Sequence, residues 1–301
     1  YTLPSYPPAA ARDVREWGGM AVLAYPDDPR YRWSYWEDDF VPDGIEIINL
    51  ASHLRAGSVW RVLTWAGFSL FNRHYFVSGL ESPQYALSRW DELLTRSAVV
   101  GFYATNAHGG FRLGDSVDVP IPSYRTALGF VGLGIDPRYR DQPERAIRTG
   151  DFFSVVRGAG EPDRFEFARE SDGHLRVSVE AAEELSARVV LKRDGRIVAE
   201  TRDGGLVHQP GRGVYRAEVY LEAHPLLASD VPWILSNPIR VGVAYPRPSP
   251  DVLACTQRMA LALDEFRVET DEDSTASLEL SPSGLTLSYD LAQATPESPE
   301  R

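Results

Sequence analysis

Residues 84–104 read QYALSRWDELLTRSAVVGFYA and join two patterns of apolar residues. Within residues 84–96 the apolar side chains recur every three or four positions, which predicts an amphipathic helix with one face on a core. Residues 99–104 are continuously apolar, which predicts a strand buried on both faces. A helix that leads directly into such a strand is typical of a parallel sheet in an α/β domain.

The preceding sequence extends this pattern. Residues 20–24 (MAVLA) and 44–50 (GIEIINL) are two more compact apolar runs, and each predicts a buried strand. Residues 9–17 predict a short helix that ends at Gly18-Gly19. In α/β folds the functional loops follow the carboxyl ends of the strands. We therefore expect a site around Tyr25, the residues after Leu50, and the segment after Ala104.

After residue 152 the apolar pattern changes to a period of two. Turn signals at Gly173, Gly195 and Gly204 separate short runs that predict strands, and this spacing favours an antiparallel, Ig-like β-sandwich. The predicted strands cover residues 164–168, 175–179, 187–191, 196–201, 213–221 and 239–243, and later 266–269, 276–280 and 285–289. We expect an α/β region at 1–150, a sandwich at 151–245, and an incomplete β-rich segment with an acidic tail at 246–301.

Composition excludes several classes of function. The chain has 301 residues, of which 43% are hydrophobic, and this is enough apolar material for a sizeable core. Its formal net charge of −12 argues against binding to nucleic acid or to an anionic membrane surface. No apolar run approaches the roughly 20 residues of a membrane-spanning helix. The single cysteine, Cys255, excludes an internal disulfide and a zinc site built from cysteines.

Two histidines follow predicted strand ends. His108 comes soon after the strand at 99–104, and its small neighbours allow a ligand to approach closely. A neutral imidazole at that position suits metal binding or proton transfer. His53 follows the strand at 44–50 and is a candidate to line a cleft. The sequence contains no Gly-x-Ser-x-Gly element, so Ser-His-Asp catalysis has no support.

The segment 26–41 (PDDPRYRWSYWEDDFV) is both acidic and aromatic. It is interpreted either as a long loop that caps the domain or as a substrate-facing lid that offers a stacking surface to a sugar or to an aromatic ring. The adjacent acids Asp27-Asp28 and Asp38-Asp39 offer a carboxylate pair for a glycosidase, but neighbouring surface acids are usually solvated. The glycines of residues 129–134 (GFVGLG) lack the dinucleotide-binding spacing.

The order of several motifs resembles the PHP (polymerase and histidinol phosphatase) superfamily over roughly residues 9–243. The similar segments are WGGMAVLAYP (17–26), DGIEIIN (43–49), RWDELL (89–94), VVGFYATNAHG (99–109), the helix and strand at 146–153, and WILSNPI (233–239). The resemblance implies a distorted (β/α)7 barrel, of which this chain supplies the C-terminal portion, followed by a small β domain. It also implies two or three divalent metal ions (Mn, Zn or Fe) that activate a water for ester hydrolysis.

The chain departs from the family pattern at the metal ligands. His108 matches a ligand, but Asn106 stands where the family has aspartate and Tyr25 where it has histidine. The chain begins after the position expected for the family's His-x-His. Neutral amide and phenol oxygens are weaker donors than carboxylate and imidazole, so we expect a weakened cluster. The resemblance assigns His108 and Asn106 to the metal, and Glu46, His53 and Tyr25 to the surrounding cleft.

Two functions are consistent with these patterns. The first is a PHP-like metal-dependent hydrolase that acts on a small phosphoester or ester and is weak or inactive in this segment. The alternative is a catalytically degenerate, PHP-derived module that binds a glycan at the aromatic loop or a protein partner. The β-sandwich and the low cysteine content are compatible with an extracytoplasmic protein.

Overall fold

The structure is a computed structural model, and it describes residues 7–26, 28, 41–49, 73–105, 111–113, 117–119, 128–181, 186–244, 275–281 and 284–290. The chain divides into two compact units, Tyr1–Ser249 and Pro250–Arg301. Among the described residues, the first unit contains the parallel sheet and the larger antiparallel sheets, and the second contains one hairpin. The described fold is mixed α/β with mostly antiparallel sheets, and the described strands form no closed barrel.

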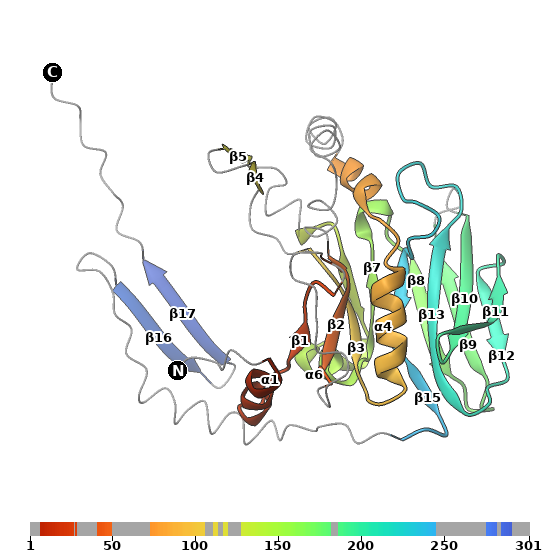
Figure 1. Cartoon of the computed structure of the whole chain (residues 1–301), viewed down its shortest axis with the longest axis horizontal. Helices are drawn as coiled ribbons and strands as arrows, with labels where there is room; N and C mark the ends of the chain where they lie inside the picture. Colours follow the sequence, from red (N-terminus) through yellow and green to blue (C-terminus); the bar gives the residue numbers. More distant parts are fainter. Residues whose placement is uncertain are drawn as a thin grey trace. The chain divides into compact units, whose positions relative to one another are not determined.

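A three-stranded parallel sheet forms at the predicted strands. Its order is β1 (Val22–Leu23), β2 (Gly44–Asn49), β3 (Val100–Ala104). Helix α4 (Gln84–Leu94) packs beside this sheet, as Figure 1 shows, and it buries the apolar face predicted from its spacing. The buried residues of α4 are Ala86, Leu87, Trp90, Leu93 and Leu94.

The amino end of the parallel sheet is fixed by one carboxylate. Helix α1 (Pro7–Glu16) ends in a turn at Gly18, whose φ of 76° suits a residue without a side chain. From α1, Arg15 Nε donates to both oxygens of Asp43 at 3.0 and 3.1 Å. The backbone N–H of Ala21 donates to Asp43 Oδ2 at 2.8 Å. Asp43 therefore joins the helix, the segment before β1 and the start of β2.

The larger antiparallel sheet has seven strands, in the order β11-β10-β13-β14-β7-β6, with β15 paired to β13. Its central strand β13 (Gly213–Leu221) is buried along its whole length and pairs with β10, β14 and β15. The remaining strands are β6 (Gly132–Ile135), β7 (Phe152–Val155), β10 (Ala187–Arg193), β11 (Arg196–Thr201), β14 (Ile234–Ser236) and β15 (Ile239–Val241).

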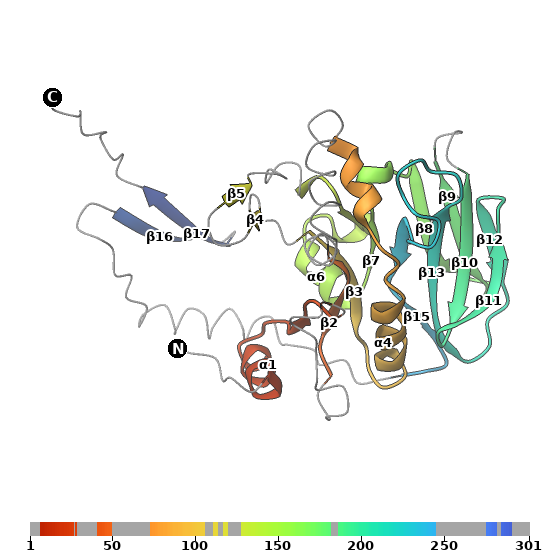
Figure 2. The same ribbon diagram turned by 45° about the horizontal axis from the view of Figure 1, so that its top comes forward.

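The second sheet of the sandwich has the order β12-β9-β8, formed by β8 (Arg164–Arg169), β9 (Leu175–Glu180) and β12 (Gly205–His208). Figure 2 shows it beside β10, β11 and β13, and the buried side chains of β9 share one core with those strands. The predicted turn glycines Gly173, Gly195 and Gly204 all have φ between 72° and 90°. Glycine is therefore the residue that best fits the backbone of these three turns.

The expected domain division at residue 150 lies between two hydrogen-bonded strands. Helix α6 (Pro143–Thr149) ends at Gly150 with φ of 77°, and β7 follows it. β7 pairs on one side with β6 and on the other with β14 of the sandwich. Residues on both sides of the expected division thus belong to one sheet, and the division into two domains stays a prediction.

Several short elements complete the described residues. They are the 3-10 helices η1 (Arg73–Gly79), η2 (Pro137–Tyr139) and η3 (Arg157–Ala159), and the hairpin of β4 (Phe111–Leu113) and β5 (Val117–Val119). In the second unit β16 (Thr275–Ser281) pairs with β17 (Gly284–Asp290), while the strand predicted at 266–269 lies outside the described residues. No helix in the described ranges is long and apolar enough to cross a membrane.

Gly101 on β3 tests how tightly α4 packs. A Cβ at this position would lie 2.8 Å from the ring of Trp90. The backbone of Gly101 also exchanges two hydrogen bonds with the Asn237 side chain, so the strand has little room to shift. We expect Gly101→Ala to lower the free energy of unfolding by about 1–3 kcal/mol in chemical denaturation.

Gly205→Ala is the matched control, because the nearest atom to its added Cβ would be 3.9 Å away. We expect this control to change stability by less than about 0.5 kcal/mol. Equal effects of the two substitutions would contradict the close packing of Trp90 on β3.

Candidate functional site

The carboxyl ends of β1, β2 and β3 lie at one edge of the parallel sheet, because the three strands run in the same direction. Tyr25 follows β1, and Asn49 is the last residue of β2. Asn49 is 2% exposed, so a polar side chain is buried at this edge. This carboxyl edge is the place where the sequence predicts a site.

A bulge in β2 brings two polar side chains together. Residues 46 and 49 would point to opposite faces of a regular strand, because side chains alternate with a period of two. The pairing of β2 with β3 shifts register between Glu46 and Ile48, so one extra residue is inserted. Glu46 and Asn49 consequently meet, and Asn49 Nδ2 donates to Glu46 Oε2 at 2.7 Å.

Tyr25 joins the same carboxylate through its backbone. It has a φ of 55°, an uncommon left-handed conformation for a residue with a side chain. In this conformation the Tyr25 N–H donates to Glu46 Oε2 at 3.3 Å, and the Tyr25 carbonyl accepts from the Asp28 N–H at 3.3 Å. Strained backbone of this kind is concentrated at ligand and active sites.

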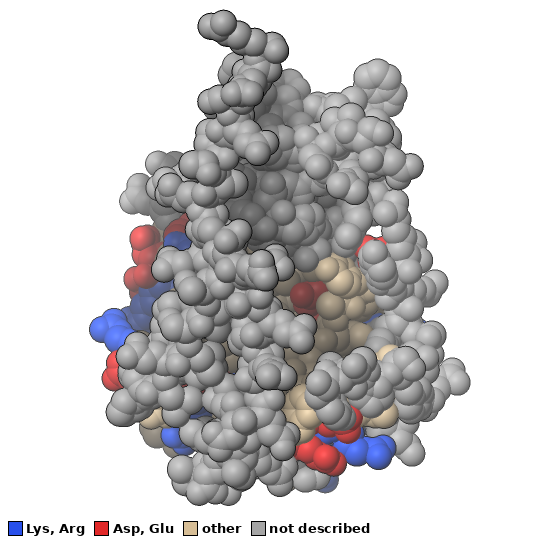
Figure 3. Space-filling view, turned by 90° about the vertical axis from the view of Figure 1, so that its left-hand side faces the viewer, with Lys and Arg blue, Asp and Glu red and all other residues tan. Residues whose placement is uncertain are grey.

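Asp28 differs from the sequence expectation. Adjacent acids were expected to be solvated, but Asp28 is only 3% exposed. A buried carboxyl close to the end of β1 adds a second acidic group to this part of the fold. Figure 3 views the molecule from the side of the parallel sheet, and acidic atoms are visible there among tan residues.

The structure places only part of the predicted site. Glu46 and the Tyr25 N–H are hydrogen-bonded to each other at the carboxyl edge, and their assignment to a cleft stays a prediction. The other three predicted site residues, His53, Asn106 and His108, lie outside the described residues, as does most of the aromatic loop, including Trp33 and Trp36. Within the described ranges, no group of three or more His, Cys, Asp or Glu side chains is placed to hold a metal ion.

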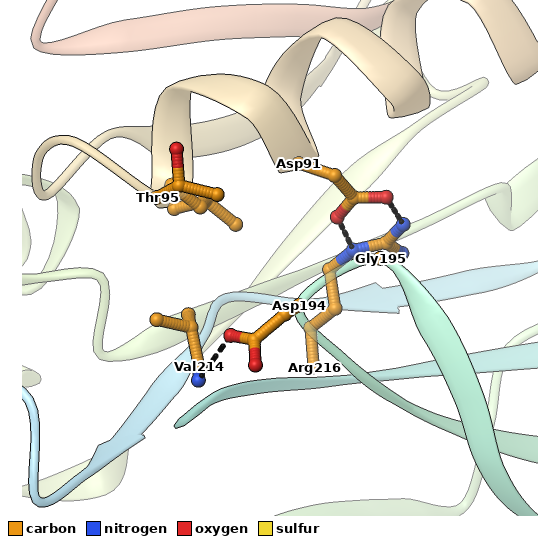
Figure 4. Close-up of a pocket in the computed structure, with 7 residues that line it drawn as sticks. Asp91, Thr95, Asp194, Gly195, Val214 and Arg216 are labelled. Atoms are coloured by element: carbon orange, nitrogen blue, oxygen red, sulfur yellow. Dashed lines mark hydrogen bonds and ion pairs between the residues drawn. The ribbon is translucent and has the colours of Figure 1, made fainter. Parts of the chain in front are cut away.

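The RWDELL segment has a structural role that sequence analysis did not find. Trp90 Nε1 donates to the Val99 carbonyl at 3.0 Å and so ties α4 to the residue before β3. Asp91 accepts two hydrogen bonds from Arg216 of β13, at 2.7 and 2.8 Å, as Figure 4 shows. The Arg216 guanidinium also lies 5.3 Å from the Trp90 ring. Two consecutive residues of α4 therefore connect the parallel sheet to the sandwich.

The Arg216 side chain belongs to a buried charge network. On β13 it also pairs with Glu218, whose other oxygen lies 3.1 Å from Lys192 Nζ. Burial alone would raise the pKa of Glu218, but the charges of Arg216 and Lys192 outweigh it and lower that pKa to about 2. Burial also disfavours the charged guanidinium, but Glu218 and Asp91 more than compensate and raise the pKa of Arg216. Arg216 and Glu218 thus keep each other charged, and Asp91 and Lys192 pair with them.

A separate groove of about 810 Å³ lies between the edge strand β8 and the strands β6 and β7. Phe153 and Phe165 meet edge to face in its lining, with ring centroids 4.8 Å apart. Its charged side chains are largely paired internally, since Arg138 bonds Asp136 and Arg164 bonds Glu166. None of the site residues predicted from the sequence lines this groove.

Comparison of the chain with family models, with curated proteins and with solved structures gave no match. The function must therefore be argued from the residues and the geometry. Two regions are candidates, the carboxyl edge and the groove beside β8. The carboxyl edge has buried polar groups, a β-bulge and a left-handed backbone conformation at Tyr25, and these features typically mark a functional site.

The contact between Glu46 and Asn49 can be tested by a charge exchange. Asn49→Asp places a second carboxylate against Glu46 Oε2 and removes a donor, so we expect a loss of about 1–3 kcal/mol in unfolding free energy. The combined substitution Asn49→Asp with Glu46→Gln restores one donor and one acceptor. Denaturation at pH 7 is expected to show recovery of most of the loss, and an additive double variant would contradict the contact.

The charge network predicts a defined pH dependence. The pKa of Glu218 is lower in the folded chain than its ordinary value of 4.5, so its stabilising contribution is complete above 4.5 and is lost as the pH falls toward 2. Glu218→Gln leaves Arg216 and Lys192 without this carboxylate, and we expect a loss of about 3–5 kcal/mol at pH 7. Denaturation between pH 7 and pH 3 should show the wild type approaching the variant as the pH falls.

Glu222→Gln is the matched control for that series. Glu222 pairs with Arg202 at the surface, and its side chain is 30% exposed. Surface pairs contribute about 0–1 kcal/mol, so this control should change stability little at any pH. A pH-independent difference between wild type and Glu218→Gln would contradict the network.

Proposed function

We propose that this chain is a PHP-like module of the metal-dependent hydrolase class, with its site at the carboxyl edge of β1, β2 and β3 and with little hydrolytic activity of its own. The support for the class is the order of the similar segments along the sequence, together with three of them forming adjacent parallel strands. A substrate of this class would be a small phosphoester or ester. The C-terminal portion of a PHP barrel, followed by an Ig-like sandwich, remains part of the same proposal.

The low activity follows from the donors available at the carboxyl edge. Glu46 Oε2 already accepts hydrogen bonds from the Asn49 amide and the Tyr25 N–H, and these donors occupy the lone pairs that a metal ion needs. Tyr25 offers a phenol where the family has an imidazole, and Asn106 an amide where it has a carboxylate. These residues do not fit a cluster of two or three divalent ions. We therefore assign no reaction step to a metal.

The described residues are suited to holding a ligand. The Asn49 amide fixes the orientation of the Glu46 carboxylate, and both come from the same bulged strand. A fixed carboxylate beside an amide can accept and donate hydrogen bonds to a hydroxyl-rich or amide-rich ligand. These residues would bind and orient a substrate whether or not it is hydrolysed.

This geometry favours a second candidate function, a PHP-derived binding module for a glycan or a protein partner. The specific observation is that the Asn49 amide and the Tyr25 N–H both donate to Glu46 Oε2 and so fix the orientation of this carboxylate. The aromatic loop of residues 26–41 would supply the stacking surface for a sugar. A glycan array and an ester hydrolysis screen on the same preparation distinguish the two candidates.

The ligand substitutions can be reversed experimentally. We expect Tyr25→His combined with Asn106→Asp to bind Mn²⁺ or Zn²⁺ at least about tenfold more tightly than wild type in isothermal titration calorimetry, because it restores an imidazole and a carboxylate. Hydrolysis of aryl phosphates and carboxylic esters should stay near background for the wild type.

Tyr139→His is the control, since it adds a histidine on η2, outside the three strand ends. It should leave metal affinity unchanged. Unaltered metal uptake by the double variant would contradict the placement of residues 25 and 106 at a former metal site. Metal-dependent turnover by the wild type would contradict its assignment as a weak hydrolase.

A further inference from the structure

The loop between β13 and β14 is fastened by one histidine ring. His224 Nδ1 accepts hydrogen bonds from the backbone N–H groups of Leu226 at 3.2 Å and Leu227 at 2.8 Å. Because Nδ1 accepts both of these bonds, the neutral ring carries its proton on Nε2. The two hydrogen bonds thus hold His224 in this neutral tautomer.

The ring fastens a loop that reaches the core. Leu227 is 2% exposed and Val231 is fully buried, so two side chains of this otherwise exposed loop pack in the core. Further along the loop, the Pro232 carbonyl accepts from Tyr103 Oη of β3 at 2.8 Å. A change in how His224 holds this loop therefore acts on a segment that contacts the parallel sheet.

Protonation of His224 is incompatible with this geometry. A proton on Nδ1 replaces the acceptor by a donor that faces two N–H groups, and both hydrogen bonds are then lost. We propose that His224 is a pH-sensitive latch that holds residues 224–228 in the observed loop conformation when neutral and releases them when protonated.

A neighbouring positive charge also favours the neutral form of His224. His74 on η1 binds the neighbouring carbonyl of Gly158 at 2.9 Å through Nδ1. Burial lowers the pKa of His224, the bond to Ala159 partly offsets this, and the charge of His74 lowers it further. The other charged groups on these elements are Arg157, paired with Glu161; Glu222, paired with Arg202; and Asp230 on the loop itself.

The sign of the pH effect follows from this lowered pKa. The unfolded or released loop takes up a proton near the ordinary value of 6.5, before the latched loop does. The latch therefore contributes its full stability above pH 6.5 and loses it as the pH falls below that value. We therefore expect the latch to be released on the acid side of neutral pH.

Hydrogen-exchange mass spectrometry of the whole chain tests the latch. Between pH 7.5 and pH 5.0, after correction for the intrinsic exchange rate, we expect a peptide spanning residues 222–230 to lose protection by about tenfold or more. A peptide from β13, buried along its length, should keep its protection and serves as the internal reference.

His224→Asn is the matched variant, because an asparagine oxygen can accept from the N–H groups two and three residues later and does not titrate. It is expected to keep the 222–230 peptide protected at both pH values. His74→Gln removes a neighbouring positive charge and so brings the pKa of the latched ring closer to that of the released loop, which should reduce the loss of protection at pH 5.0. Equal protection of the wild type at both pH values, or the same pH dependence in His224→Asn, would overturn the proposal.

Discussion

The bidentate pair of Asp91 and Arg216 is the interaction on which the arrangement of the first unit depends. Arg216 is 2% exposed, and a guanidinium at that depth is costly unless carboxylates surround it. Asp91 comes from α4 and Glu218 from β13, so both elements must be in place before the charges are balanced. Trp90, next to Asp91, packs on Gly101 of β3. The position of the parallel sheet is thereby set by a charge on the sandwich.

Local sequence patterns were sufficient to predict most of the individual helices and strands. Apolar spacing of three and four predicted α4, continuous apolar runs predicted the three parallel strands, and alternation predicted most of the sandwich strands. Each pattern reports burial within one segment. The pairing of β7 with β14 was missed, since it joins residues about 80 positions apart, for example Leu235 and Ser154. The Asp91–Arg216 pair was missed for the same reason, because it links residues 125 apart in the sequence.

The candidate site was predictable in position but not in detail. Tyr25 was named because it follows a predicted strand, and Glu46 because of the family resemblance; the hydrogen bond between them joins the two, while their role stays a prediction. Asn49 was overlooked because its separation of three from Glu46 implies opposite faces of a regular strand, and only the bulge brings the two together. Asp28 was assigned to solvent because it is adjacent to another acid, yet it is buried. A β-bulge leaves no clear signal in a single sequence.

Tyr25 and Asn106 offer a phenol and an amide at the positions where the PHP pattern has an imidazole and a carboxylate, and the proposed low metal affinity depends on this difference. Elemental analysis of the purified protein, expressed with manganese, zinc and iron in the medium, tests this claim most directly. We expect the purified protein to contain less than about one metal ion per chain, because amide and phenol oxygens bind these metals weakly. Two or more tightly held ions per chain would contradict it and would show that Tyr25 and Asn106 support a metal cluster.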